Sequence, residues 1–308
     1  MADTTQPNLP FDPYKPHETL KELPKALKEV LTSYSGVPED EQLEHVLQLR
    51  NEAYSCFPYP CIGMFRFIEF DLSAHYAYHD HVLLPLKQSA PDGVVVPLFL
   101  DLGTCFGQDL RKLVYDGAPA DRLWASDIEP KFIELGFKLF NDEHKLPKDH
   151  FLCPGNLLSD SPEDKLRLLD DKVTILHMTA VFHLFSLEDQ KKVANRCLRL
   201  LRKDTGGPVL LLGSQVGSTA PGPFNRLNAS QDYTHKYRHD EQTWKMMWQE
   251  VCGGESWKDK IKNVEAKSKL VHRTQEKDPE SGKITVFKEP EPGTTLAWQM
   301  FEVWVTFS

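Results

Sequence analysis

Between Pro97 and residue 217, short apolar segments alternate with amphipathic ones, and this alternation limits the fold more than any other feature of the chain. The run at 98–100 has the composition of a buried strand, whereas 187–203 repeats apolar residues at helical spacing. Strands separated by helices pair in parallel. We therefore expect an α/β sheet with helices on both faces. Two late strands, near 263–273 and 296–307, have no helix between them and should pair antiparallel.

The segments outside this alternating region predict a division of the chain into two parts. Residues 1–90 are expected to form a helical cap, because apolar residues recur at helical spacing near 18–34, after Pro38 and near 74–86. Residues 57–70 contain five aromatic side chains and should pack against the core. Residues 91–308 form the predicted core. Within it, residues 218–256 interrupt the alternation with turn residues and a Trp-rich helix, and we expect this insertion to contact the substrate.

Composition excludes several classes of protein. A net charge of −9 and a pI near 5.8 argue against nucleic-acid binding, and no apolar run reaches the ~20 residues that cross a bilayer. The amino terminus lacks the layout of a signal peptide, so we expect a cytoplasmic protein without a membrane partner. Six cysteines without a C-x-x-C pair indicate reduced thiols, and the histidine clusters lack the Glu of a zinc-protease helix, so no metal is expected. The aromatic cap and the late strands are compatible with a homodimer.

The sequence PLFLDLGTCFGQDL at 97–110 indicates a strand that ends at Asp101, a glycine turn and a helix. A triphosphate-binding loop requires Lys after its last glycine, whereas Gln108 and Asp109 follow Gly107 here. A dinucleotide fingerprint requires glycine where Cys105 stands, and Asp109 at the helix start would repel phosphate. The expected ligand therefore rests on a glycine turn but has no pyrophosphate.

The pattern D-x-G-x-x-x-G at 101–107 resembles the first motif of the class I S-adenosylmethionine (SAM)-dependent methyltransferases. This resemblance implies a Rossmann-like sheet of seven strands, the last antiparallel, with SAM as the cofactor. It also implies that one carboxylate orders the turn and the amino end of SAM. A second carboxylate, 26 residues later, is implied to accept hydrogen bonds from the ribose hydroxyls, and later residues are implied to contact adenine. The implied residues are Asp101, Gly103, Thr104, Asp127, Ile128, Asn156 and Leu157. The family more often has Asp where this chain has Asn156.

Residues 51–72 and 100–140 resemble, more closely, fungal secondary-metabolite methyltransferases of meroterpenoid pathways. The resemblance extends over about 40–215 and is weaker across 218–308. It implies methylation of a carboxylate on a polyketide–terpenoid acid of the farnesyl-dimethylorsellinate type, which gives a methyl ester. Two alternatives stay open, a phenol or hydroxyl methyltransferase and a methyltransferase-like cyclase or non-transferring protein of the same fold.

The acceptor decides whether a general base is needed. A carboxylic acid is ionised at neutral pH, whereas a phenol or alcohol requires a base such as histidine. His177, expected to close the fourth strand near the reactive methyl group, is the candidate for a base or an acceptor-positioning residue, and hydrogen-bonded packing is its alternative. His183 is expected to be structural. Arg66 could receive a substrate carboxylate or pair with Glu69. Tyr59 and neighbouring aromatic residues suit a lid over adenine or over an isoprenoid tail, and packing in an aromatic core is their alternative.

Overall fold

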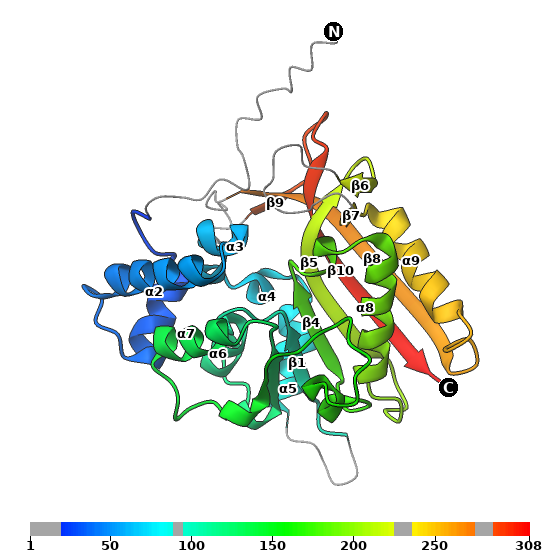
Figure 1. Cartoon of the computed structure of the whole chain (residues 1–308), viewed down its shortest axis with the longest axis horizontal. Coiled ribbons are helices and arrows are strands. Elements are labelled where there is room, and N and C mark those ends of the chain that lie inside the picture. Colours follow the sequence, from blue (N-terminus) through cyan, green and yellow to red (C-terminus); the bar gives the residue numbers. More distant parts are fainter. Residues whose placement is uncertain (1–19, 89–94, 225–235, 275–285) are drawn as a thin grey trace.

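The computed structural model describes residues 20–88, 95–224, 236–274 and 286–308 (Figure 1). Its main sheet has the strand order β3-β2-β1-β4-β5-β10-β8-β9. The strands are β1 Phe99–Leu102, β2 Leu123–Ser126, β3 Phe151–Leu152, β4 Ile175–Thr179, β5 Val209–Ser218, β8 Ile261–Thr274, β9 Val286–Lys288 and β10 Leu296–Phe307. Strands β1 to β5 are parallel, and β10 pairs antiparallel with both β5 and β8. The expected class I methyltransferase arrangement of seven strands is confirmed, and the short β9 extends its edge.

Helices cover both faces of the sheet, as predicted. On one face lie α6 Gln108–Tyr115, α7 Pro130–Phe140, η3 Tyr78–Leu83 and α5 Leu84–Lys87, and on the other lie α8 Leu187–Leu200 and α9 Glu241–Gly253. Successive side chains of a strand point to opposite faces. Phe99 of β1 therefore belongs to the buried cluster that contains Leu110 of α6, whereas Leu100 belongs to the cluster that contains Val193 of α8. No helix of the described ranges is both long and apolar enough to cross a membrane.

The amino-terminal helices form a cap that packs on the core. They are α1 Lys25–Val30, η1 Leu31–Ser35, α2 Gln42–Cys56, α3 Pro60–Gly63, η2 Arg66–Ile68 and α4 Asp71–Ala74. The first helix begins only after Pro24, because proline fits the start of a helix but not its interior. The single helix expected over 74–86 is instead divided among α4, η3 and α5. Val46 and Ala53 of α2 share one buried cluster with Phe132 of α7, so the cap and the core are continuous.

A fully buried ion pair of the core forms a hydrogen bond with a residue of this cap. Arg111 of α6 donates from Nε to Asp142 Oδ2 at 2.9 Å and from Nη2 to Oδ1 at 3.0 Å. Tyr34 of η1 donates its hydroxyl to the same Oδ2 at 2.7 Å. Neither charged side chain is exposed to solvent. A residue of the cap thus completes the hydrogen bonding of a buried carboxylate in the core.

The insertion between β5 and β8 contains a hairpin followed by the predicted Trp-rich helix. Strands β6 Gly222–Phe224 and β7 Lys236–Arg238 pair antiparallel, and Asp240 caps α9 through a reciprocal pair of hydrogen bonds with Thr243. Figure 1 shows β6 and β7 beyond the upper end of β5, opposite the end of the sheet where the chain terminates. The remaining short helices are η4 Ala120–Arg122, η5 Lys148–His150, η6 Lys165–Leu169 and η7 Phe182–Leu184.

Candidate active site

The glycine turn after β1 is tied to the end of β2. The backbone N–H groups of Gly103 and Thr104 both donate to the carbonyl oxygen of Ser126, at 2.8 and 3.0 Å. Gly103 has φ +73°, and a Cβ there would lie 2.4 Å from Cγ2 of Val181. Because both the backbone angle and the available space disfavour a side chain, the glycine is required. The Thr104 hydroxyl donates to Oδ2 of Asp101 at 2.6 Å, which links the turn to the strand.

Cys105 keeps the turn in the shape that a glycine would give it. Its φ of +54° is in the left-handed region, where a side chain other than glycine is uncommon. Its backbone N–H donates to Asp127 Oδ2 at 2.8 Å. Gly107, at φ +64°, then leads into α6. The cysteine therefore alters the motif at the level of sequence but not the course of the backbone.

Asp127 lies directly after β2 and is 8% exposed. Its Oδ2 accepts from Cys105, and its Oδ1 accepts from the backbone N–H of Glu129 at 3.0 Å. The backbone N–H of Ile128 also acts on this carboxylate, so backbone donors engage both oxygens. Burial raises the pKa of this carboxyl to about 6, although backbone donors oppose the rise. Ile128, next in the chain, is 54% exposed and so presents an apolar side chain at the surface.

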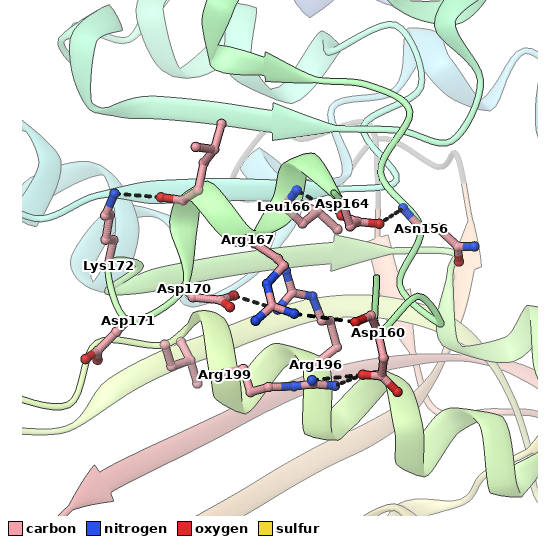
Figure 2. A network of polar contacts seen from close by, with 12 residues as sticks. Asn156, Asp160, Asp164, Leu166, Arg167, Asp170, Asp171, Lys172, Arg196 and Arg199 are labelled. Atoms are coloured by element: carbon pink, nitrogen blue, oxygen red, sulfur yellow. Dashed lines mark hydrogen bonds and ion pairs between the residues drawn. The ribbon is translucent and has the colours of Figure 1, made fainter. Parts of the chain in front are cut away.

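The loop after β3 lies beside Asp127, since Gly155 donates its N–H to the Asp127 carbonyl at 2.8 Å. Asn156 is exposed, and its side-chain oxygen accepts from the N–H of Leu158 at 3.0 Å. Its own N–H donates to Asp164, which also caps η6 (Figure 2). Half-buried Leu157 packs against the apolar cluster on the α8 face. The loop that follows β2 and the loop that follows β3 are therefore neighbours, and the contact of Asn156 and Leu157 with adenine stays a prediction.

The network in Figure 2 continues from this loop to α8. Arg199 donates from both terminal nitrogens to Oδ1 of Asp160 at 2.9 Å, and Arg196 donates to Asp170 at 2.5 Å. Arg167 donates to the Asp160 carbonyl at 3.5 Å. These contacts join α8 to the segment between β3 and β4.

His177 does not close the fourth strand, and that prediction was wrong by two residues. It lies inside β4, which continues to Thr179, and its register partner is Asp101 of β1. Its Nδ1 lies 2.7 Å from Asp101 Oδ1, and its Nε2 lies 2.9 Å from the Thr179 hydroxyl. Burial alone would lower the pKa of His177, but the charge and hydrogen bond of Asp101, together with the charges of two further carboxylates, outweigh it and raise this pKa. The imidazole is 1% exposed and has partners at both nitrogens, so its catalytic role stays a prediction.

Two further titratable groups lie beside this pair and were not predicted as site residues. Asp109, in the first turn of α6, is buried and accepts the N–H of Leu72 from the cap at 3.1 Å. Burial raises the pKa of Asp109 to about 7; the charge of Asp101 adds to the rise, and that of His177 opposes it. His75 is also buried, and burial lowers its pKa to about 3. Asp109 was considered only as a repellent for phosphate, and no periodicity signals its burial beneath the cap.

The two residues predicted to contact the substrate, Arg66 and Tyr59, have different partners. Arg66 donates to Glu69 at 2.6 Å and to Asp71 at 3.2 Å, and its guanidinium lies 4.8 Å from the ring centre of Trp298. Tyr59 lies near the start of α7, with its ring centre 6.1 Å from that of Phe132. Arg66 therefore forms the ion pair that was its alternative, and Tyr59 lies beside α7, the helix that follows Asp127 in the chain. Their contact with a substrate stays a prediction.

His183 has the hydrogen bonding of a structural residue. It is buried in η7, and its Nδ1 accepts the N–H of Val216 at 3.3 Å. Burial lowers the pKa of His183 well below its ordinary value, so the ring is neutral. Among the described residues, no group of three or more His, Cys, Asp or Glu side chains is arranged to hold a metal ion.

Comparison with known proteins gives matches over most of the chain. Residues 14–68 match the family model described as the meroterpenoid methyltransferase N-terminal domain. The chain is 31% identical over 271 residues to the O-methyltransferase phiE of Fungal sp. (strain ATCC 74256), which covers 87% of this chain and 85% of phiE. It is 33% identical over 267 residues to the methyltransferase adrK of Penicillium roqueforti, covering 85% and 89%.

A third relative is the Asnovolin E/Chermesin D methyltransferase nvfJ of Aspergillus novofumigatus, 34% identical over 224 residues, covering 73% of this chain and 75% of nvfJ. Among solved structures, a SAM-dependent methyltransferase from Thermotoga maritima aligns with a TM-score of 0.40 at 12% identity, covering 83% of this chain and 98% of that one.

Proposed function

The chain belongs to the fungal secondary-metabolite methyltransferases, and from this premise we propose that it transfers a methyl group from SAM to a carboxylate of a meroterpenoid acid. The product is a methyl ester of a polyketide–terpenoid intermediate of the farnesyl-dimethylorsellinate type. The observation that carries the proposal is the junction of the left-handed turn at 103–107 with the buried Asp127 carboxylate, which binds the turn at Cys105.

The residues at this junction fit the parts of SAM. The Asp127 carboxylate has more lone pairs than backbone donors and could accept hydrogen bonds from the ribose hydroxyls, and the exposed Ile128 could cover one face of adenine. Asn156 and Leu157 would contact the adenine edge, and Asp101, Gly103 and Thr104 would order the amino-acid end. When bound, SAM supplies a methyl group on a positively charged sulfur, which is electrophilic without help from a metal.

The chain has to position the acceptor and exclude water. Orienting two reactants can lower a barrier by ~7–11 kcal/mol. A carboxylate acceptor is already ionised and needs no proton acceptor from the protein. This agrees with His177, whose two ring nitrogens already have partners in Asp101 and Thr179. We propose that His177 orients Asp101. A phenol acceptor would require one of its nitrogens to become free.

The substrate is proposed to lie between the cap helices α1 to α4 and the insertion between β5 and β8. Tyr59 would cover the adenine end, since its ring lies beside Phe132 of α7. Arg66 would reach an acceptor only by exchanging a carboxylate partner, Glu69 or Asp71.

The test is incubation of the protein with methyl-labelled SAM and a farnesylated dihydroxybenzoic acid, followed by mass spectrometry. The expected product has one added CH2 and returns to the acid on mild alkaline hydrolysis, because an ester is cleaved whereas an aryl methyl ether is not. A label that resists alkali would favour the phenol alternative. A product of unchanged mass would favour the cyclase. Failure of S-adenosylhomocysteine (SAH) to bind in calorimetric titration would overturn the SAM site itself.

A further inference from the structure

A row of polar side chains begins in the glycine turn and crosses β1 and β4 to β5. The Thr104 hydroxyl donates to Asp101 Oδ2 at 2.6 Å, and Asp101 Oδ1 lies 2.7 Å from Nδ1 of His177. Nε2 of His177 lies 2.9 Å from the Thr179 hydroxyl, which lies 3.4 Å from the hydroxyl of Ser214. Thr179 and Ser214 are register partners in the parallel pair of β4 and β5. This polar row therefore connects the turn proposed to bind SAM with the end of β4.

Thr179 is the member of the polar row that reaches the surface. The other four side chains are each at most 4% exposed, whereas Thr179, the last residue of β4, is partly exposed. A hydroxyl has a proton and two lone pairs, and only one of these positions is used by His177. The contact with Ser214 at 3.4 Å is longer than the about 2.5–3.0 Å of an O–H···O hydrogen bond. The Thr179 hydroxyl can therefore bind a further group.

The backbone after Thr179 lies beside the glycine turn. Ala180 has φ +59°, in the left-handed region that residues other than glycine seldom adopt, and its N–H donates to the Ser214 carbonyl at 2.7 Å. Val181 follows, and its Cγ2 lies 2.4 Å from the place that a Cβ on Gly103 would take. Backbone strain of this kind is common at functional sites, where the surrounding packing maintains it. Thr179 is therefore fixed at the edge of the sheet where the turn lies.

The protonation of His177 decides whether Thr179 donates or accepts a hydrogen bond. The Asp101 carboxylate only accepts, so Nδ1 of His177 carries a proton. In a neutral ring Nε2 has a lone pair, and the Thr179 hydroxyl donates its proton to it. In a protonated ring Nε2 donates to Thr179 instead, and the hydroxyl proton is then available to another group.

The charges around His177 favour the protonated ring. Burial opposes it, but the charge and hydrogen bond of Asp101, with the charges of Asp109 and Asp71, outweigh burial and raise the pKa of His177. Burial, with the charge of His177, lowers the pKa of His75 to about 3, so this neighbouring ring remains neutral. His177 is thus the cation of a buried ion pair with Asp101. The hydroxyl beside it is left with a proton to donate.

A group that has lone pairs and no proton suits such a donor. We propose that the Thr179 hydroxyl donates a hydrogen bond to one oxygen of the acceptor carboxylate and is oriented by the pair of Asp101 and His177, an inference that rests on the proposed function. The other carboxylate oxygen remains available for methylation. A phenol would need the opposite arrangement, in which His177 is neutral and Thr179 accepts the phenolic proton. The polar row thus favours an ionised acid over a phenol.

The experiment compares Thr179→Val, which keeps the shape of the side chain and removes the hydroxyl, with Thr179→Ser, which keeps the hydroxyl. Calorimetry measures how a farnesylated dihydroxybenzoic acid and its methyl ester bind to the enzyme–SAH complex. Thr179→Val should weaken binding of the acid about ten- to a hundredfold, the loss expected for a hydrogen bond to a charged group, and binding of the ester less than about tenfold. Thr179→Ser should restore binding of the acid. Thr306→Val, at a partly exposed position of β10, is the matched control and should change neither affinity.

The outcomes separate this inference from the proposed function. If Thr179→Val forms the ester with an unchanged KM for the acid, the contact is refuted and the function stands. If Thr179→Val loses affinity for the acid and Thr179→Ser regains it, but the wild type transfers no methyl group, the function is refuted and the contact stands.

Two further outcomes bear on the contact itself. An equal loss of SAH affinity and of acid affinity in Thr179→Val would mean that Thr179 only supports the turn through His177 and Asp101, which refutes the proposal. Should Thr179→Val fail to fold, as judged by circular dichroism, Thr179→Ala decides: an unchanged ratio of acid affinity to ester affinity refutes the contact, and a ratio that falls supports it.

Discussion

The hydroxyl of Tyr34 offers a test of how the cap is held on the core. It donates to Asp142 at 2.7 Å, and the carboxylate also binds Arg111 through two hydrogen bonds. Burial, with the charge of Asp142, raises the pKa of Tyr34 far above its ordinary value, so the hydroxyl keeps its proton and remains a donor. Tyr34→Phe removes this one donor and leaves the ring in place.

The expected loss follows from the charge of the acceptor. A hydrogen bond to a charged group contributes about 1.5–3 kcal/mol. Unfolding entropy of about 2.1 cal/mol/K per residue, over the 308 residues, gives roughly 0.65 kcal/mol/K, so Tm should fall by about 2–5 °C. Asp142→Ala should cost more, about 3–5 kcal/mol, because it leaves the buried Arg111 without its counter-ion.

Thermal unfolding followed by circular dichroism measures these shifts, with Tyr115→Phe as the control. The Tyr115 side chain is partly exposed, so its change should stay within about 0.5 kcal/mol. Hydrogen exchange over 25–56 should also accelerate in Tyr34→Phe, since the lost contact joins the cap to the core. If Tyr34→Phe melts at the same temperature as Tyr115→Phe, the buried network does not fasten the cap.

Four further predictions concern the site. Gly103→Ala should lower stability by about 1–3 kcal/mol and weaken SAH binding, because the added Cβ meets Val181 at positive φ; an unchanged Tm would contradict this. SAH affinity of the wild type should fall as pH drops through about 6, when Asp127 gains a proton, whereas Asp127→Asn should bind about tenfold more weakly without that pH dependence in calorimetry. His177→Ala should methylate an acid with a kcat within about tenfold of the wild-type value. If His177 were instead a required base, kcat would fall about 100-fold or more. Asp109→Asn should raise the free energy of unfolding above pH 7, as measured by urea unfolding. Because the pKa of Asp109 is raised in the folded state, the free energy of unfolding of the wild type falls as pH rises from about 4 to 7, and the variant lacks this fall. Equal pH profiles for the two proteins would refute this.

Local patterns were sufficient to predict the fold class. Strand-like and helix-like periods alternate from residue 97 onward, and each reports interactions within a few residues of the chain. They predicted the parallel strands, the antiparallel pairing of β8 with β10 and the helices on both faces. Boundaries were less accurate where proline or a change of helix type intervened, as in α1 after Pro24 and in the divided helix of 71–87.

The glycine turn and Asp127 were also predictable, because turn chemistry and the end of a strand are local features. The backbone conformation of Cys105 was harder to predict from the sequence, because its left-handed backbone accompanies a hydrogen bond from its N–H to Asp127. In the first case the residue type dictates the conformation. In the second, a partner 22 residues away maintains it.

What the amino-acid sequence determined by itself was the type of sheet and the place of a ligand-binding turn on it. Only the tertiary structure decided which distant charges meet: His177 with Asp101, and Arg111 with Asp142 beneath Tyr34. Periodicity reports which side of an element is buried, but the partner of a buried charge is selected by packing between distant segments. The pKa of such a group, and therefore its chemistry, follows from that packing.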